Sequence, residues 1–232
     1  MIRIASNMHI SNVWLLDTGR ERILIDTGYT LERPLLQKTL WRWGIRAKGD
    51  LAAVILTHRH SDHAANAAWL RATFDAPIVC HEDDARVLMG AAPAPKLCGV
   101  AHQHLHERLL SMIEDRLPAR CQVDEALQEG RWRKNFKVFH VAGHTEGSIL
   151  ILHEPSATLF SGDAILAGLA PFRFIEKIAL AVPGFSLDVE AVRQRTRAAL
   201  AEVGEVHALC AGHGPLVDQQ AAAKIMKLRG YP

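Results

Sequence analysis

The sequence predicts an α/β domain, and three patterns along the chain support this fold class. Residues 51–81 alternate short apolar runs, typical of strands, with apolar residues at helical spacing, and such a β-α-β pattern implies parallel strands. Strand-like runs fill two separate stretches, residues 1–81 and 120–214. No low-complexity linker divides the chain, so we expect these stretches to be layers of one domain spanning residues 1–232.

In the first half, strands are expected where apolar runs end in turn residues. Residues 2–28 contain two such runs, each ending in Asp-Thr-Gly, and residues 31–43 carry apolar residues at helical spacing. We then expect a strand at 51–56, an alanine-rich helix at 64–74 and a strand at 76–81. The residues between the first of these strands and the helix therefore lie on a loop.

The second half has the same character. We expect strands at 135–141, 148–152 and 157–161, a helix at 187–202 with Ser186 as its N-cap, a strand running into a loop at 207–214, and a terminal helix at 216–228.

Residues 82–118 do not continue this alternation of predicted strands and helices, which indicates an insertion. Pro93 and Pro95 end any helix before them, and a second helix is expected near residues 100–116. The apolar face of that helix contains Leu105, Leu109, Met112 and Ile113. We expect this face to pack against the domain, as a helical cap beside the functional site.

Composition and charge argue against two classes of partner. The 27 Lys and Arg residues nearly balance 25 Asp and Glu residues, and a net charge of +2 is too small to indicate a nucleic acid or an anionic membrane. No apolar run reaches the roughly 18 residues of a membrane span, and the first residues lack a signal-peptide pattern. The four cysteines lack CxxC spacing, so we expect free thiols and a cytoplasmic location.

The strongest functional pattern is a run of histidines and an aspartate on the loop after a predicted strand, Thr57-His58-Arg59-His60-Ser61-Asp62-His63. Imidazole nitrogens and carboxylate oxygens suit zinc and its first-row neighbours. Residues two apart in an extended segment point the same way, so His58 and His60 can reach one ion. Asp62 and His63 follow a turn later and can reach a second ion, because a catalytic zinc takes about three protein ligands.

Three further candidate ligands each follow a predicted strand and a glycine. They occur in the pairs Gly143-His144, Gly162-Asp163 and Gly212-His213. A glycine before the ligand lets the backbone come close to a crowded centre. Ligand loops at the ends of several strands are a common way for a sheet to build a site.

These residues resemble the metallo-β-lactamase-fold hydrolases, and within them the glyoxalase II-like branch. HxHxDH is the signature of that family, and the later His, Asp and His keep the family's order, from Leu24-Ile25-Asp26-Thr27-Gly28 to Gly212-His213-Gly214-Pro215. The resemblance implies an αββα sandwich of two mixed β-sheets flanked by helices, with metals at one edge. It also implies that Asp26 lies beside the metal loops without being a ligand, whereas the alternative for Asp26 and Thr27 is a locally capped turn.

Carried over residue by residue, the resemblance implies two divalent metal ions. One would be held by His58, His60 and His144, the other by Asp62, His63 and His213, with Asp163 bridging the two. Zinc is expected, although iron and manganese accept the same ligand types. A hydroxide bridging the metals would attack the substrate, with Asp163 and Asp62 as the catalytic carboxylates and Asp62 able to shuttle a proton.

Within the family, several activities are disfavoured. True β-lactamases generally lack an aspartate at the bridging position, which Asp163 occupies here. N-acyl homoserine lactonases place a tyrosine soon after that aspartate, whereas this chain reads Ala164-Ile165-Leu166. We find no counterpart of the helical glutathione-binding domain of glyoxalase II, of the RNA-binding arm of tRNA-processing nucleases, or of the flavin domain of flavodiiron proteins.

The sequence thus predicts an enzyme that hydrolyses a small ester, thioester or lactone. The alternatives are a mononuclear iron dioxygenase that acts on persulfides, and a phosphodiester or nucleic-acid hydrolase of the same fold. Residues 164–185 are rich in apolar side chains, which either fill the core, form a homodimer contact, or line a pocket for an apolar acyl group. In the pocket interpretation, Arg173 or Lys177 would meet an anionic group of the substrate.

Two weaker patterns have simpler explanations. His102, His104 and His106 alternate along the chain, but on a helix only the outer two share a face, so we expect a solvated surface. Cys210 lies three residues before His213, and we expect it to be a buried structural thiol.

Overall fold

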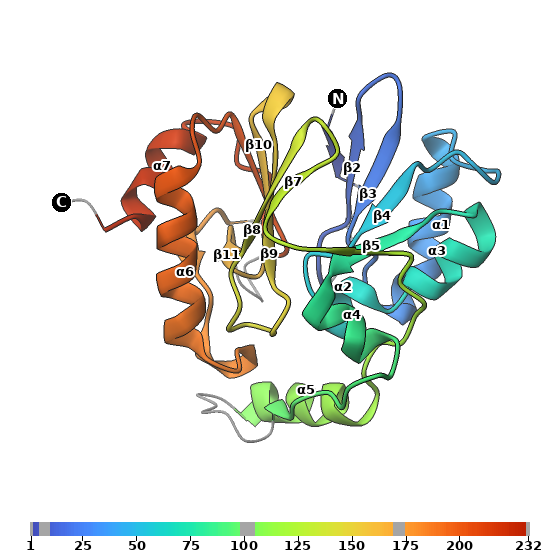
Figure 1. Cartoon of the computed structure of the whole chain (residues 1–232), viewed down its shortest axis with the longest axis horizontal. Helices are drawn as coiled ribbons and strands as arrows, with labels where there is room; N and C mark the ends of the chain where they lie inside the picture. Colours follow the sequence, from blue (N-terminus) through green and yellow to red (C-terminus); the bar gives the residue numbers. More distant parts are fainter. Residues whose placement is uncertain (1, 5–9, 98–104, 169–174, 231–232) are drawn as a thin grey trace.

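The protein is a pair of β-sheets packed face to face, with helices on the outer side of each sheet (Figure 1). This computed structural model describes residues 2–4, 10–97, 105–168 and 175–230. Both sheets mix parallel and antiparallel neighbours. The arrangement confirms the predicted αββα sandwich.

The first sheet contains, in spatial order, β1 (Ile2–Ile4), β2 (Trp14–Asp17), β3 (Arg22–Ile25), β4 (Ala53–Ile55), β5 (Ile78–His81) and β6 (Glu125–Leu127). Strands β3 to β6 are parallel. The second sheet contains β13 (Ala208–Ala211), β10 (Thr158–Gly162), β9 (Ile149–His153), β8 (Phe136–His140) and β7 (Gly130–Trp132). A short hairpin pairs β11 (Ile165–Leu166) with β12 (Ala179–Leu180).

Helices cover the outer faces of the two sheets. Figure 1 shows α1 (Arg33–Arg42) and α3 (Ala67–Phe74) outside the first sheet, and α6 (Val189–Glu202) and α7 (Ala221–Leu228) outside the second. The shorter elements are η1 (Thr30–Glu32), α2 (Ser61–Ala64), α4 (Glu82–Leu88), η3 (Glu154–Ser156) and η4 (Pro183–Phe185). Among the described residues, no helix combines the length and the apolarity that crossing a membrane requires.

The core forms three layers because the strands are buried on both faces. In β2, Trp14 and Leu16 point into the core between the two sheets, while Leu15 points the other way into the core beneath α1 and α3. In the second sheet, Leu150 belongs to the outer core beneath α6 and Ile151 to the inner one. This alternation with a period of two residues is what a strand buried on both faces produces.

Several predicted boundaries differ from the structure. The helix expected at 187–202 begins at Val189, and its N-cap is Asp188, whose carboxylate accepts a hydrogen bond from the amide of Ala191. Ser186 is therefore not the N-cap of α6; it lies at the C-terminal end of η4 instead. The helix expected at 64–74 begins at Ala67, and Ser61–Ala64, expected to lie mostly on the preceding loop, forms the short helix α2. The terminal helix begins at Ala221. Strands β6 and β7 and helix α4 were not predicted, because each is short and none carries a clear apolar run.

Helix α5 (Leu105–Arg116) crosses the bottom of the molecule in Figure 1, and its orientation corrects an expectation. A helix was expected in this segment, but Leu105, Leu109 and Ile113 are exposed to solvent. These three residues of the apolar face therefore do not pack on the domain, although the helix lies beside the ligand segment, where Glu114 accepts a hydrogen bond from the Ser61 amide at 3.1 Å. The inward face is polar instead, because Ser111 donates a hydrogen bond to the carbonyl of Gly184 at 3.3 Å.

Candidate metal centre

The ends of the strands bring the predicted ligands to one edge of the sandwich. Strands β3 and β4 are parallel, so Asp26 and the loop that begins at Thr57 leave the first sheet at the same end. In the second sheet, β8, β10 and β13 run in one direction, and His144, Asp163 and His213 follow them. Each sheet therefore supplies part of one site.

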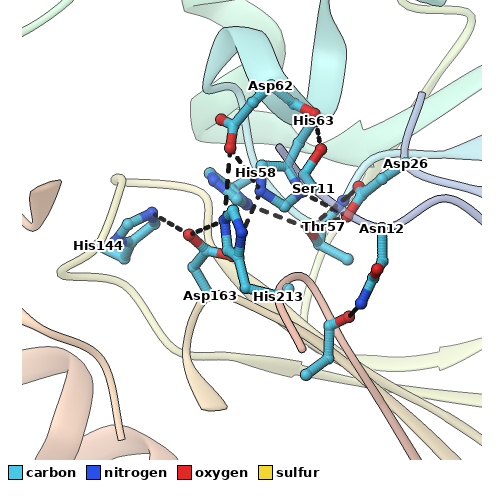
Figure 2. A network of polar contacts seen from close by, with 12 residues as sticks. Ser11, Asn12, Asp26, Thr57, His58, Asp62, His63, His144, Asp163 and His213 are labelled. Atoms are coloured by element: carbon cyan, nitrogen blue, oxygen red, sulfur yellow. Dashed lines mark hydrogen bonds and ion pairs between the residues drawn. The ribbon is translucent and has the colours of Figure 1, made fainter. Parts of the chain in front are cut away.

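All seven predicted ligands meet at this edge (Figure 2 shows six of them). Three groups have ligand atoms within 4.8 Å of one another, namely His58, His60 and His144; His58, Asp62 and His63; and His63, Asp163 and His213. The groups share His58 and His63, so they form one continuous cluster. The structure thus brings together residues that are up to 155 positions apart in the sequence.

Two histidines are held by hydrogen bonds to fixed acceptors outside the cluster. The Nδ1 atom of His213 donates to the carbonyl of Ile10 at 2.8 Å, and the Nδ1 atom of His63 donates to the carboxylate of Asp26 at 2.8 Å. A histidine whose Nδ1 carries the proton presents its Nε2 as a ligand. Both Nε2 atoms point into the cluster, where they approach Asp163.

Two further histidines are held by hydroxyl groups. His58 Nδ1 lies 3.1 Å from Thr57 Oγ1, and His144 Nδ1 lies 3.1 Å from Ser186 Oγ. Each hydroxyl donates its proton elsewhere, Thr57 to Asp26 and Ser186 to a backbone carbonyl, so each accepts from the imidazole. Ser186, expected as a helix cap, therefore orients a ligand.

Five buried polar atoms inside the cluster have no hydrogen-bond partner among the described residues. They are the Nε2 atoms of His58, His60, His63 and His144, together with Asp163 Oδ1. Buried polar atoms are nearly always satisfied, so a group of five in one place requires a ligand that is not part of the chain.

The spacing of the cluster suits metal ions. The Nε2 atoms of His63, His144 and His213 lie 3.2 to 3.6 Å from the oxygens of Asp163. These separations exceed the roughly 2.7–2.9 Å of a charge-assisted hydrogen bond. Two atoms each about 2.1 Å from one ion lie roughly 3.4 Å apart at a tetrahedral angle. The donor set therefore fits divalent metal better than it fits direct hydrogen bonding.

The charges of the cluster are strongly coupled. Burial opposes ionisation of Asp62 and Asp163, yet His63 and His213 hold the pKa of both carboxyls well below the usual range. Burial also disfavours a charged His213, but Asp163 and Asp62 raise its pKa to about 10. Burial lowers the pKa of His144 to about 4. The ionised carboxylates require nearby positive charge, which protonated histidines supply without metal and a cation would supply in their place.

Asp26 ties the first-sheet ligands together. Its backbone has a φ of 63°, an uncommon conformation outside glycine that turns the chain sharply at the end of β3. Its carboxylate accepts hydrogen bonds from the Thr57 amide at 2.7 Å and from His63 Nδ1 at 2.8 Å. Through Thr57 it also fixes His58. This position beside the ligands agrees with the resemblance and not with a locally capped turn.

Two glycines allow the ligand loops to approach one another. A Cβ on Gly212 would lie 2.7 Å from His63 Cε1, and a Cβ on Gly162 would lie 2.7 Å from Thr57 Cβ. The predicted role of a preceding glycine is confirmed at these two positions. Gly143 differs, because its Cβ would meet the backbone of α6 and not the metal cluster.

A buried ion pair, which the sequence did not reveal, joins the ligand loops of the two sheets. Arg59 lies between His58 and His60, and its Nε is 3.7 Å from Asp84 Oδ1 and 3.2 Å from Glu146 Oε2. Asp84 accepts hydrogen bonds from Thr145 Oγ1 at 2.7 Å and from the amide of Gly147 at 2.9 Å. Burial raises the pKa of Asp84 to about 6 against the opposing effect of Arg59, so Asp84 is ionised at neutral pH.

His81 and His140 also form a contact that spans the two sheets. Together with Asp83 they form a further group with ligand atoms within 4.8 Å. Their rings, however, are stacked, with centroids 3.8 Å apart and planes inclined by 17°. Imidazole lone pairs lie in the ring plane, so parallel rings cannot both direct a nitrogen at one ion. His140 Nε2 also donates to the carbonyl of Glu146 at 2.7 Å, which makes this a structural contact.

The described residues include only some of those on which the remaining sequence interpretations rest. Cys210 is a buried free thiol, as expected, and burial raises its pKa well above the usual range. In residues 164–185, Ile178 and Leu180 pack against the outer core of the second sheet, and Ile175 is exposed. Phe172, Arg173 and Phe174 lie outside the described residues, as do His102 and His104.

Comparison with known proteins identifies the family. Residues 7–213 match the sequence profile of the metallo-beta-lactamase superfamily. The chain belongs to this superfamily. The resemblance to this family drawn from HxHxDH is confirmed, and the cluster of His and Asp side chains is a candidate metal site.

Two curated relatives agree with this assignment. The chain is 28% identical over 163 residues to a probable metallo-hydrolase, YybB, of Bacillus subtilis, covering 67% of this chain and 62% of that protein. It is 33% identical over 129 residues to a hydroxyacylglutathione hydrolase of Bdellovibrio bacteriovorus, covering 56% of this chain and 40% of that protein. The chain thus spans less than two thirds of the length of these relatives.

Solved structures share the fold. BLEG-1, a B3 metallo-beta-lactamase, aligns with a TM-score of 0.65 and 23% identity over 94% of this chain and 93% of that one. TTHA1623, solved in a di-iron-bound form, aligns with a TM-score of 0.63 and 24% identity over 94% of each chain. At these identities the similarity establishes the metallo-β-lactamase fold alone.

The buried ion pair leads to a prediction about stability. We expect Asp84→Ala to lower the free energy of unfolding by about 3 kcal/mol, because it removes the fully buried carboxylate beside Arg59, which keeps only the part-exposed Glu146, and takes away the acceptor of Thr145 Oγ1 and the Gly147 amide. Urea denaturation of the metal-free protein measures this quantity. The matched control is Asp83→Ala, a more exposed neighbour on the same helix, which should cost well under about 1 kcal/mol. Equal effects of the two substitutions would contradict a special role for Asp84.

Proposed function

We propose that the chain is a dinuclear metal-dependent hydrolase of a small ester, thioester or lactone. The observation that carries the proposal is the set of buried, inward-facing nitrogen and oxygen atoms that have no hydrogen-bond partner among the described residues. Seven ligands exceed what a single ion takes, since a catalytic zinc uses about three protein ligands and leaves a position open. Two ions sharing one carboxylate account for the whole set.

The geometry supports a specific division of the ligands. His58, His60 and His144 would hold one ion. Asp62, His63 and His213 would hold the other, since Asp62 Oδ2 lies 3.4 Å from the Nε2 atoms of both histidines. Asp163 stands between the two sets, because its Oδ2 lies 3.6 Å from His144 Nε2 and 3.2 Å from His213 Nε2. A carboxylate in this position is suited to bridge two ions.

The bound ions would lower the pKa of a water molecule toward about 7 and polarise the scissile group of the substrate. The chain itself fixes four of the ligand histidines through Nδ1. It also buries His58, His60 and His144, the ligands of the first ion. His144 is 3% exposed, whereas Asp62 and His213 are 25% and 23% exposed. We infer that substrate approaches from the side of Asp62 and His213. Asp62, the more exposed of the two carboxylates, is our candidate to exchange a proton with solvent.

Two considerations favour an ester or thioester over other bonds. A relative that aligns with part of the chain is a hydroxyacylglutathione hydrolase, which cleaves a thioester. The bridging aspartate that true β-lactamases generally lack is present here as Asp163. For the metal, zinc is our first expectation, and the di-iron-bound form of TTHA1623 makes iron the next to test.

The first prediction of this proposal concerns the number of metal ions per chain. Elemental analysis after reconstitution with excess zinc should give two ions per chain, because seven ligand groups are available. Protein as purified, analysed for iron and assayed for oxygen consumption with a persulfide, and the zinc-reconstituted protein, assayed for hydrolysis of phosphodiesters, separate the alternatives. One iron per chain together with persulfide-dependent oxygen uptake would replace our proposal by the dioxygenase.

The second prediction concerns Asp163. We expect Asp163→Ala to lower kcat/KM by more than about 100-fold, since loss of a bridging ligand should exceed the 10- to 100-fold effects of residues outside the ligand set. Circular dichroism would establish that the variant is folded, and Asp218→Ala serves as an exposed aspartate control. Near-normal turnover of a folded Asp163→Ala protein would show that this carboxylate does not bridge.

The third prediction concerns the substrate. If the apolar residues of 164–185 line a pocket, kcat/KM should rise with acyl length, because each buried methylene is worth about 0.8 kcal/mol. A series of thioesters from about two to eight carbons tests this. A flat or falling series would assign those residues to the core, as the packing of Ile178 and Leu180 already does for two of them.

A further inference from the structure

Helix α5 carries an exposed row of large aliphatic side chains. We call this row the outer stripe, and it consists of Leu105, Leu109, Leu110, Ile113 and Leu117. Its members are between 44 and 73% exposed. Successive positions four residues apart lie on one face of a helix, so the stripe is continuous along the whole of α5. The largest contiguous apolar patch on a protein surface is often functional.

The orientation of the helix is fixed by its polar face. Glu114 accepts a hydrogen bond from the amide of Ser61 at 3.1 Å, and Asp115 accepts one from the amide of Leu97 at 2.7 Å. Ser111 is fully buried against η4. These contacts hold the acidic and hydroxyl side chains inward, so α5 cannot roll over to bury the outer stripe without breaking them.

The charge of α5 argues against an anionic membrane as the occupant of this face. Interfacial helices are usually rich in Lys and Arg. Helix α5 contains two arginines, Arg108 and Arg116, against three acidic residues, Glu107, Glu114 and Asp115, so it has a small excess of negative charge with histidine neutral. The occupant is therefore expected to be an apolar protein surface.

We propose that the outer stripe packs against the same stripe of a second copy of this chain, with the two helices antiparallel. The stripe is self-complementary under a two-fold axis, because Leu109 would face Ile113 of the partner and Leu105 would face Leu117 of the partner. The exposed fractions of the five side chains correspond to on the order of 500 Å² per protomer. Two such faces bury about 1,000 Å², which meets the lower limit for a specific interface.

The proposed interface has a consequence for the site. Through Glu114, α5 holds the amide of Ser61, which lies between the candidate ligands His60 and Asp62. Through Ser111, it holds Gly184, two residues before Ser186, the partner of His144. Dimerisation would therefore restrain a helix that touches segments next to the ligands from both sheets. The dimer itself does not rest on the proposed function, and its test uses no assay of activity.

The experiment is sedimentation velocity of the full chain from about 1 to 100 μM, the range in which an interface of this size is expected to dissociate. The wild-type protein should show a concentration-dependent monomer–dimer equilibrium. The variant Leu109→Glu/Ile113→Glu should raise the dissociation constant at least about tenfold, since two charges would be buried without partners. A milder variant, Leu109→Ala/Ile113→Ala, should weaken the dimer in the same direction. Thermal melting of both variants establishes that they are folded.

The matched control is Leu31→Glu, which changes an 82% exposed leucine in η1, outside the stripe. This variant should associate like the wild-type chain. A wild-type chain that remains monomeric throughout the range, or a dimer that the stripe variants leave unchanged, would overturn the proposal. The wild-type chain should not sediment with vesicles of phosphatidylcholine and phosphatidylglycerol. A monomer that binds these vesicles through the stripe would assign the face to a membrane and refute a second copy.

Discussion

The metal site depends on one constraint. In four of the candidate ligand histidines, the ring nitrogen that faces away from the cluster is already in contact with another group of the protein. An imidazole can bind a metal in a fixed direction only if its other nitrogen is already engaged. Here the backbone of Ile10, the carboxylate of Asp26 and the hydroxyls of Thr57 and Ser186 engage four Nδ1 atoms. The Nε2 atoms are left pointing at one another, an arrangement that is costly in a buried site unless a cation lies between them.

The fold serves this constraint by distributing the anchors over both sheets. The first sheet supplies Asp26 and the segment from Thr57 to His63, which ends in α2, and the second supplies His144, Asp163 and His213. Neither sheet contains a complete set, so the sandwich must be closed for the site to exist. The pair formed by Arg59 and Asp84 reinforces this closure, because it links the middle of the HxHxDH segment to the loop that carries His144.

Much of this arrangement could be predicted from the sequence, for physical reasons. Strands buried on both faces appear as continuous apolar runs, and the ligand types and their spacing follow from coordination chemistry. The contacts that fix the ligands were harder to predict, because they depend on tertiary structure. Ser186 has the features of a helix cap, and its contact with His144 follows only from where η4 ends.

The orientation of α5 was mistaken for a related reason. Apolar spacing identifies a helix and its apolar face, but it does not determine which face meets the domain. In α5, the buried contacts are made by Ser111, Glu114 and Asp115, whose side chains pair with backbone groups of distant segments. No local pattern in the sequence predicts these hydrogen-bond partners, because they lie in distant segments of the chain.

The central claim is that the inward-facing nitrogens and Asp163 hold two ions. Anomalous diffraction from crystals of the zinc-reconstituted protein, collected on both sides of the zinc absorption edge, tests it most directly. We expect two peaks roughly 3.5–4 Å apart. One should be bound by the Nε2 atoms of His58, His60 and His144, and Asp163 should contact both. A single peak at full occupancy, or coordination through Nδ1, would contradict the account.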